Sequence, residues 1–372
     1  MITLLTVIGA RPQIIKAAAI SRAIKKSFSE TIHEKILHTG QHYDNNMSQV
    51  FFDELDIPEP DYNLGVGSCS HGVQTSRIIE GIERVLSVEH FDGVILYGDT
   101  NSTLAGAIAA SKLNIPVFHV EAGLRSYNMS MPEEINRIVC DQLSSILFAP
   151  TQTAVNNLQM EGLENSPARF ADGRKRSVIL SGDVMFDNAL YYSRLAEQRS
   201  RILESCSVCA GEYILATVHR DFNTDVPDRI ESIFKALSFI ADRYHIPIVL
   251  PLHPRTRKYL PEGLSPLIKV IPPASFFDIL QLEKSAKVVM TDSGGVQKES
   301  FFFGRPCVIL RPETEWVEIV ENGAGILADA VFDRIVHAYD AISGKSIVFP
   351  PLFGDGHAAD VILSSVKEYY RL

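Results

Sequence analysis

The stretches Gly93-Val-Ile-Leu-Tyr-Gly98-Asp99-Thr100 and Pro116-Val-Phe-His119-Val-Glu121-Ala-Gly123-Leu-Arg125 each begin as an apolar run of strand length and end in a carboxylate. Ligands of an open parallel sheet bind outside the carboxyl ends of its strands, so Asp99 and Glu121 would look into one crevice. Either carboxylate alone is explained as the cap of the helix that follows. Two on successive strands, followed by Pro132-Glu133-Glu134-Ile-Asn136-Arg137, favour a functional site.

Strand-like and helix-like segments alternate along the whole chain, which predicts α/β layers around parallel sheets. In the first half the expected strands are 2–9, 34–39, 93–98, 116–121 and 146–150. The expected helices there are 14–26, 102–113, 132–145 and 151–161. The polar segment 164–176 is expected to be a linker.

A second series begins, on this interpretation, with strand 177–181. It continues with strands 213–218, 246–252, 268–271, 287–291, 306–310 and 325–328. The expected helices are 229–243, 276–285, 316–322, 332–342 and an amphipathic helix at 358–370. We therefore expect two Rossmann-like halves facing a cleft.

Composition excludes several classes of protein. The 372 residues are 46% hydrophobic and 22% charged, enough to bury sizeable cores. The net charge of −10 argues against a nucleic-acid partner. The five scattered cysteines suit a reducing cytoplasm. We find no apolar span long enough to cross a membrane, and we interpret residues 1–9 as a buried strand rather than a signal peptide.

Two glycine-containing turns have the character of phosphate sites. Thr291-Asp292-Ser293-Gly294-Gly295-Val-Gln297-Lys-Glu299 follows an apolar strand and opens a helix. Its glycines admit close approach of a ligand, and the free N–H groups of a helix start attract anions. In Gly9-Ala-Arg11-Pro12-Gln13-Ile-Ile-Lys16, the cations Arg11 and Lys16 could hold a diphosphate. A plain glycine-rich turn is the alternative for the first motif, and neither motif fits the Walker pattern.

Two histidines, His219 and His253, stand beside arginines at the ends of second-half strands, in Ala216-Thr-Val-His219-Arg220 and Leu250-Pro-Leu-His253-Pro-Arg255. Either is a site residue or a satisfied structural histidine. The remaining histidines lack metal-ligand spacing, so we expect no metal. Gly354-Asp-Gly356-His-Ala-Ala359 superficially matches the dinucleotide fingerprint but does not open a βαβ unit. We expect no cofactor.

Taken together, these motifs resemble those of the UDP-N-acetylglucosamine 2-epimerase family. The resemblance also includes Thr39-Gly-Gln41-His42 and covers nearly the whole chain. It implies the glycosyltransferase-B architecture of two Rossmann-like domains. The implied domains are a catalytic domain at 1–170, a UDP-binding domain at 176–355, and a C-terminal helix at 356–372 that packs back on the first domain. It also implies a UDP-sugar substrate, no cofactor and a homodimer.

The resemblance carries roles to matching residues. It implies acid/base catalysis by Asp99, Glu121 and Glu133. His219 is a further candidate catalytic residue. The candidate residues for binding the UDP-sugar are Arg11, Lys16, Arg137, His253, Ser293, Gly294, Gly295 and Glu299.

Three positions depart from the better-known branch of the family. Gln13 replaces its usual glutamate, Asp221-Phe222 follows His219-Arg220 where that branch has Arg-Glu, and Trp316 stands where it has an arginine. These features are similar to the branch that epimerises UDP-2,3-diacetamido-glucuronic acid for surface polysaccharides. An extra cation for the uronate carboxylate would come from Arg125, Arg137, Arg220 or Arg255.

The residues permit non-hydrolysing epimerisation at C2, by elimination of UDP to a glycal and re-addition after proton return to the opposite face. Three alternatives stay open at this point. They are a hydrolysing epimerase that releases free sugar, a retaining glycosyltransferase on the same fold, and a catalytically silent UDP-sugar sensor.

Overall fold

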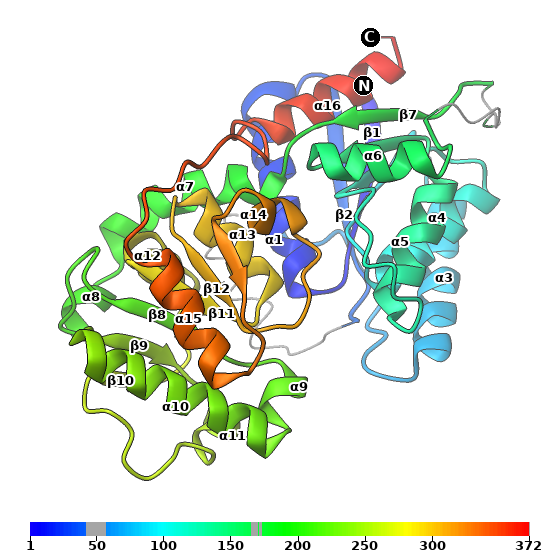
Figure 1. Ribbon diagram of the computed structural model, residues 1–372. Helices are drawn as coiled ribbons and strands as arrows, with labels where there is room; N and C mark the ends of the chain where they lie inside the picture. The colour runs from blue at the N-terminus through cyan, green and yellow to red at the C-terminus, as the bar shows by residue number, and fades with distance from the viewer. Residues whose placement is uncertain (42–56, 165–169, 171–172, 372) are drawn as a thin grey trace. The chain divides into compact units, whose positions relative to one another are not determined.

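The computed structural model describes residues 1–41, 57–164, 170 and 173–371 (Figure 1). The chain divides into two compact units. Unit 1 comprises Met1–Asn188 and Pro351–Leu372, and unit 2 comprises Ala189–Pro350. His42, and residues 165–169 and 171–172 of the expected linker, lie outside the described residues.

Unit 1 is built on a seven-stranded sheet in the order β3-β2-β1-β4-β5-β6-β7. Its strands are β1 (Ile2–Ile8), β2 (Ile32–His38), β3 (Tyr62–Asn63), β4 (Gly93–Tyr97), β5 (Val117–Val120), β6 (Ile146–Ala149) and β7 (Ser177–Leu180). Its helices are α1 (Arg11–Ala23) with the π-helical turn η1 (Ile24–Phe28), α3 (His71–Val88), α4 (Asn101–Lys112), α5 (Pro132–Leu143), α6 (Gln152–Met160), the start of α7 (Val184–Arg199) and α16 (Ala358–Tyr369).

Unit 2 has a six-stranded sheet in the order β10-β9-β8-β11-β12-β13. Its strands are β8 (Ile214–Thr217), β9 (Ile248–Pro251), β10 (Ile268–Ile271), β11 (Val288–Thr291), β12 (Cys307–Ile309) and β13 (Gly325–Leu327). Its helices are α8 (Ile202–Ser205), α9 (Asp221–Thr224), α10 (Pro227–Tyr244), α11 (Pro254–Arg257), α12 (Phe276–Ser285), α13 (Gly294–Phe302), α14 (Val317–Glu321) and α15 (Phe332–Ile342).

The expected α/β class with two Rossmann-like halves is confirmed, since the pairings in both sheets are parallel and helices alternate with strands. One strand belongs to the other half from the one expected. We expected 177–181 to begin the second series, but β7 pairs with β6 at the edge of the first sheet. The buried Arg176 supports this placement, because its guanidinium donates to the carbonyls of Ser144 (2.9 Å) and Gln142 (2.6 Å) and so ties the residue before β7 to the end of α5.

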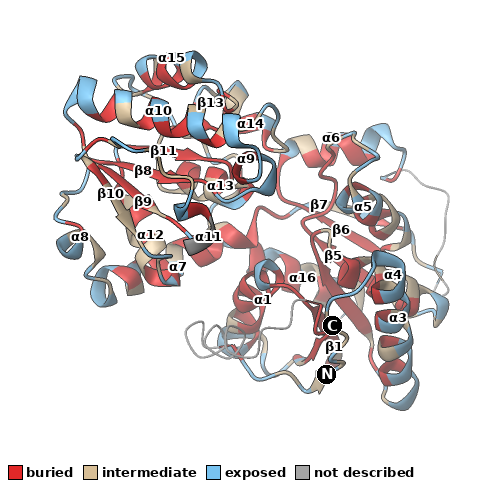
Figure 2. Ribbon diagram, turned by 90° about the horizontal axis from the view of Figure 1, so that it is seen from below, coloured by how far each residue is buried: buried red, intermediate tan, exposed pale blue. Residues whose placement is uncertain are grey.

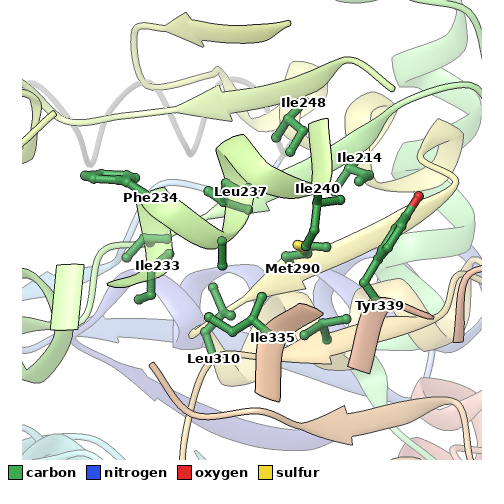
Figure 3. Close-up of a cluster of buried hydrophobic side chains, with 14 of the residues drawn as sticks. Ile214, Ile233, Phe234, Leu237, Ile240, Ile248, Met290, Leu310, Ile335 and Tyr339 are labelled. Atoms are coloured by element: carbon green, nitrogen blue, oxygen red, sulfur yellow. The ribbon is translucent and has the colours of Figure 1, made fainter. Parts of the chain in front are cut away.

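Each sheet is buried between helices whose outer faces are exposed (Figure 2). In unit 2, α10 turns the apolar side chains of Ile233, Phe234, Leu237 and Ile240 into one cluster with residues such as Met290 of β11 (Figure 3). That spacing of three and four residues is the helical period of an amphipathic helix. Burial of each such side chain stabilises the fold by roughly 1.5–3 kcal/mol.

Helix α16 packs against α1 within unit 1. Asp187 fixes its start, because the two carboxylate oxygens accept the backbone N–H groups of Ala358 (3.0 Å) and Ala359 (2.8 Å). Burial raises the pKa of Asp187 to about 6. Nearby, Gly182 and Gly354 have φ of 79° and 88°, and a Cβ on Gly182 would lie 2.9 Å from the Phe353 carbonyl oxygen. This close approach of the two segments requires glycine.

Within the described ranges, no helix is both long and apolar enough to span a membrane.

Candidate active site

The order of strands reverses between β1 and β4 in unit 1 and between β8 and β11 in unit 2. In both sheets, the connections that follow these two neighbouring strands lead away in opposite directions, and such a reversal leaves a crevice outside the carboxyl ends of the strands. Residues that directly follow β1, β4, β8 and β11 are therefore the first candidates for a ligand site.

Asp99 follows β4 in unit 1. Its Oδ2 accepts from Arg137 Nη2 at 2.7 Å, and Arg137 Nη1 donates to Glu134 Oε2 at 2.6 Å. Burial raises the pKa of Asp99 and the Glu121 and Glu133 carboxylates act in the same direction, while Arg137 and Lys16 oppose them. Because 28% of the side chain stays exposed, Asp99 is a carboxyl group that can hold a proton and still reach a ligand.

Glu121 follows β5 in a strained backbone conformation, with φ of 70°. Its Oε1 lies 2.6 Å from Lys16 Nζ, and both side chains are nearly buried. A Cβ on Gly98 would lie 3.0 Å from this ammonium and 3.6 Å from the carboxylate oxygen. The glycine between β4 and Asp99 therefore leaves the room that the ion pair fills.

Gln13 joins the ends of β1 and β4. Its Oε1 accepts the N–H groups of Gly9 (2.9 Å) and Ala10 (3.2 Å), and its Nε2 donates to the Tyr97 carbonyl (3.0 Å) and to Thr103 Oγ1 (3.0 Å). Both atoms of the amide are used, so the side chain serves as a structural tie at the point of strand reversal. In the sequence, Gln13 stands out only as a departure from a family pattern.

The two glutamates at the start of α5 have different surroundings. Glu133 is exposed, whereas Glu134 is buried and accepts the N–H groups of Ser126 and Tyr127. Burial acts to raise the pKa of Glu134, but these bonds and that of Arg137 hold it below its usual range. Glu134 thus anchors the loop before α5, and Glu133 remains accessible.

Arg125 is fully engaged inside unit 1. Its guanidinium contacts Asp141 Oδ2 at 2.7 Å and both carboxylate oxygens of Glu161 at 2.6 and 2.8 Å. Arg137 is likewise engaged by Asp99 and Glu134. Two of the four arginines expected to supply a cation for a uronate are therefore committed to internal partners.

The second reversal point, between β8 and β11, is organised by the buried Asp292. Its carboxylate accepts the backbone N–H groups of His219 (3.2 Å) and Arg220 (3.1 Å) and the Asn223 amide (3.1 Å). The His219 ring lies 3.2 Å away through Nδ1 and is 54% exposed. Asp292 therefore holds His219 at the end of β8 with its ring open to a ligand.

Ser293 caps α13 directly after Asp292, and its Oγ accepts the Val296 N–H. Gly294 is buried, and a Cβ there would lie 2.6 Å from Glu315 Oε1, whereas Gly295 is exposed. Glu299 is half-buried on the same helix. The helix start thus offers N–H groups and a hydroxyl to an anion.

Trp316 is buried beside α13. Lys298 Nζ lies 4.2 Å from the centre of its ring, a cation–π contact. Thr314 Oγ1 donates to Gln297 Oε1 at 2.6 Å and fixes the loop that carries the tryptophan.

The structure thus gathers Lys16, Asp99, Glu121 and Arg137 in unit 1, with Glu133 near Asp99. In unit 2 it gathers His219 with the predicted residues of α13. Arg11 is exposed at the start of α1, and His253 is exposed after β9, which pairs with β8. No group of His, Cys, Asp or Glu side chains in the described ranges could hold a metal ion.

Comparison with known proteins shows similarity over the whole chain. The family model for UDP-N-acetylglucosamine 2-epimerase matches residues 24–367. A UDP-2,3-diacetamido-2,3-dideoxy-D-glucuronate 2-epimerase of Pseudomonas aeruginosa is 47% identical over 368 residues, 98% of each chain. A UDP-N-acetylglucosamine 2-epimerase homolog of Methanococcus maripaludis is 44% identical, covering 98% of this chain and 99% of its own.

Among solved structures, the UDP-GlcNAc 2-epimerase of Methanocaldococcus jannaschii, in complex with UDP-GlcNAc and UDP, is similar with a TM-score of 0.84 at 39% identity. The alignment covers 99% of this chain and 100% of that one.

Proposed function

The chain belongs to the UDP-N-acetylglucosamine 2-epimerase family, and we propose that it inverts C2 of a UDP-linked 2-acetamido sugar without hydrolysis. Its fold is of the glycosyltransferase-B type. The observation that carries the proposal is the pair of carboxylates, Asp99 and Glu121, at the ends of adjacent strands. The chain that holds them is similar to a 2-epimerase of this kind over 98% of its length.

The chemistry requires a site with two functions. The C2 proton is only weakly acidic until the bond between C1 and the UDP oxygen breaks, so departure of UDP must be stabilised while a base removes the proton. We assign the diphosphate to the start of α13, with Ser293, Gly294 and Gly295, and to His219 in unit 2. Arg11 and Lys16 are the proposed cations of unit 1, and His253 and Glu299 complete the proposed binding set.

Proton transfer is assigned to Asp99, Glu121 and Glu133. Inversion needs removal of the C2 proton on one face of the sugar and its return on the other, and two carboxyl groups with different surroundings suit that task. Asp99 is buried enough for its pKa to be raised, whereas Glu121 is paired with Lys16. Re-addition of UDP to the glycal then completes the cycle.

The proposed substrate is UDP-2,3-diacetamido-glucuronic acid, in preference to UDP-N-acetylglucosamine. Two observations support this choice: the 47% identity to an epimerase of that name, and the Trp316–Lys298 contact in place of the other branch's arginine. With Arg125 and Arg137 engaged internally, the exposed Arg220 is the proposed partner of the uronate carboxylate.

Incubation of the protein with each UDP-sugar in deuterated water tests the function. We expect deuterium at C2 and a product that remains UDP-linked, seen by proton NMR. Release of free sugar would establish a hydrolysing enzyme instead, and turnover without any acceptor would exclude a glycosyltransferase. Binding of the UDP-sugar without entry of deuterium at C2 would favour a UDP-sugar sensor. Equal or greater efficiency with UDP-N-acetylglucosamine would overturn the substrate choice and leave the epimerase assignment intact.

We further propose that the protein acts in the cytoplasm as a homodimer, serving surface polysaccharide synthesis. This rests on the family resemblance and on the absence of a membrane-spanning helix in the described ranges. Light scattering of the purified protein tests the oligomeric state, since a mass of 41.2 kDa would show a monomer.

A further inference from the structure

His119 lies in the middle of unit 1 with no exposed surface. It belongs to β5, two residues before Glu121, and its ring points toward two oxygen atoms. Nδ1 lies 2.7 Å from Asp141 Oδ1, and Nε2 lies 2.8 Å from the carbonyl oxygen of Gly98. A carbonyl oxygen only accepts hydrogen bonds, and so does an ionised carboxylate. Both ring nitrogens must therefore carry a proton, which makes the side chain an imidazolium.

The surroundings balance this buried charge. Asp141 is itself fully buried and is shared between His119 and Arg125, whose guanidinium also holds Glu161. Cys140 of α5 acts on the His119 ring, and Arg176, just before β7, acts on Asp141. Burial acts to lower the pKa of His119, but Cys140 and Asp141 hold it well above its usual range. His119, Arg125, Asp141 and Glu161 thus form a network of two cations and two carboxylates, and Arg176 acts on Asp141 from outside it.

This network fixes both loops that carry the proposed acid/base groups. The Gly98 carbonyl that accepts from His119 belongs to the peptide joining Gly98 to Asp99. On the other side, Asp141 Oδ2 accepts the N–H of Gly123 at 3.2 Å, in the turn that holds Glu121 at positive φ. The orientation of both carboxylates therefore depends on a side chain that contacts neither of them.

We propose that His119 is a positioning residue for the epimerisation, a buried imidazolium that sets the Asp99 loop through the Gly98 carbonyl and the Glu121 turn through Asp141. This inference deepens the proposed function and rests on it. Displacement of a reacting group by about 1 Å can cost on the order of a hundredfold in rate. The contact to Gly98 is therefore expected to affect turnover much more than nucleotide binding.

The protonation state is measured first, on the unmodified protein. Histidine labelled with ¹⁵N at both ring positions gives resonances for 11 residues, and the pair missing from the His119→Gln spectrum belongs to His119. We expect both nitrogens of that ring to be protonated at pH 7.5. A neutral His119 ring at pH 7.5 would overturn the proposal, whatever the protein catalyses.

Two matched variants then separate positioning from simple structural loss. His119→Gln places an amide N–H near the position of Nε2 and keeps a donor for the Gly98 carbonyl, whereas His119→Asn keeps only a donor near Asp141. We expect kcat to fall about a hundredfold in His119→Asn and about tenfold or less in His119→Gln, with KM and UDP affinity changed less than threefold in both. His337→Gln, at an exposed histidine of α15, is the control and should match the parent protein.

The outcomes distinguish this inference from the proposed function. If the parent protein incorporates no deuterium at C2 but the His119 ring stays doubly protonated, the epimerase assignment fails and the buried imidazolium stands. If the parent is active and the two variants lose turnover equally, or lose UDP affinity in proportion to turnover, His119 does not position the site through Gly98 and the proposal is wrong.

Discussion

Replacing Asp292 by asparagine changes one buried oxygen into an amide nitrogen and removes a negative charge. The carboxylate accepts three hydrogen bonds, from the His219 and Arg220 backbone and from Asn223. Hydrogen bonds to a charged acceptor contribute roughly 1.5–3 kcal/mol and neutral ones about 0.5–1.5 kcal/mol, so the three together lose about 3 kcal/mol. With no exposed surface at Asp292, solvent does not compensate for this loss.

Thermal unfolding measures the effect directly. A loss of about 3 kcal/mol corresponds to a fall of about 6–12 °C in the midpoint of a unit of this size. Because the His219 loop must also be reordered around the ligand, we expect UDP to bind about tenfold more weakly by calorimetry. Glu321→Gln, the same chemical change at an exposed position, is the control. A midpoint within about 2 °C of the parent together with unchanged UDP affinity would refute the role given to Asp292.

Three further predictions concern other parts of the chain. Asp99→Asn and Glu121→Gln should each lower turnover by on the order of a hundredfold with UDP affinity nearly unchanged, and a variant that kept a third of its activity would have no acid/base role. The pKa of Asp187 is raised to about 6, so the folded state binds the proton more tightly than the unfolded state and its free energy of unfolding falls as pH rises from about 4 to 6. In Asp187→Asn this fall, of up to about 3 kcal/mol, should disappear from unfolding experiments across the same pH range. Trp316→Arg should destabilise unit 2 by setting a cation against Lys298, and adding Lys298→Glu should restore at least part of the loss in the melting midpoint; no restoration would mean that the cation–π contact is not what the substitution breaks.

Much of the fold was predictable because buried parallel strands are short apolar runs and the helices between them are amphipathic. The error at β7 shows where that information ends. Its residues Ser177–Leu180 form a strand on either interpretation. Which sheet they join depends on tertiary contacts, namely the pairing with β6 and the hydrogen bonds of Arg176 to the end of α5. Helix α3 is missing from the expected elements, although its buried residues Ile78, Ile82 and Val85 follow the helical period.

The candidate site was predictable where residues directly follow strands. Asp99, Glu121 and His219 follow apolar runs, and parallel pairing places such positions at one edge of a sheet. Gln13 could not be found this way, because its partner Tyr97 lies 84 residues along the chain. His119 and Asp141 are similarly 22 residues apart. Those interactions depend on which strands become neighbours, and that is a property of the whole sheet.

The division of the chain into units has a consequence for its biosynthesis. Unit 1 is discontinuous, and α16, which covers α1, is translated only after all of unit 2. A nascent chain that has emerged as far as β7 has its first sheet complete, yet the apolar face that meets Ile362, Leu363 and Val366 of α16 is still open. Unit 2 is one continuous segment and can fold once it has left the ribosome. Until α16 has been translated, unit 1 exposes apolar surface of the kind that chaperones bind.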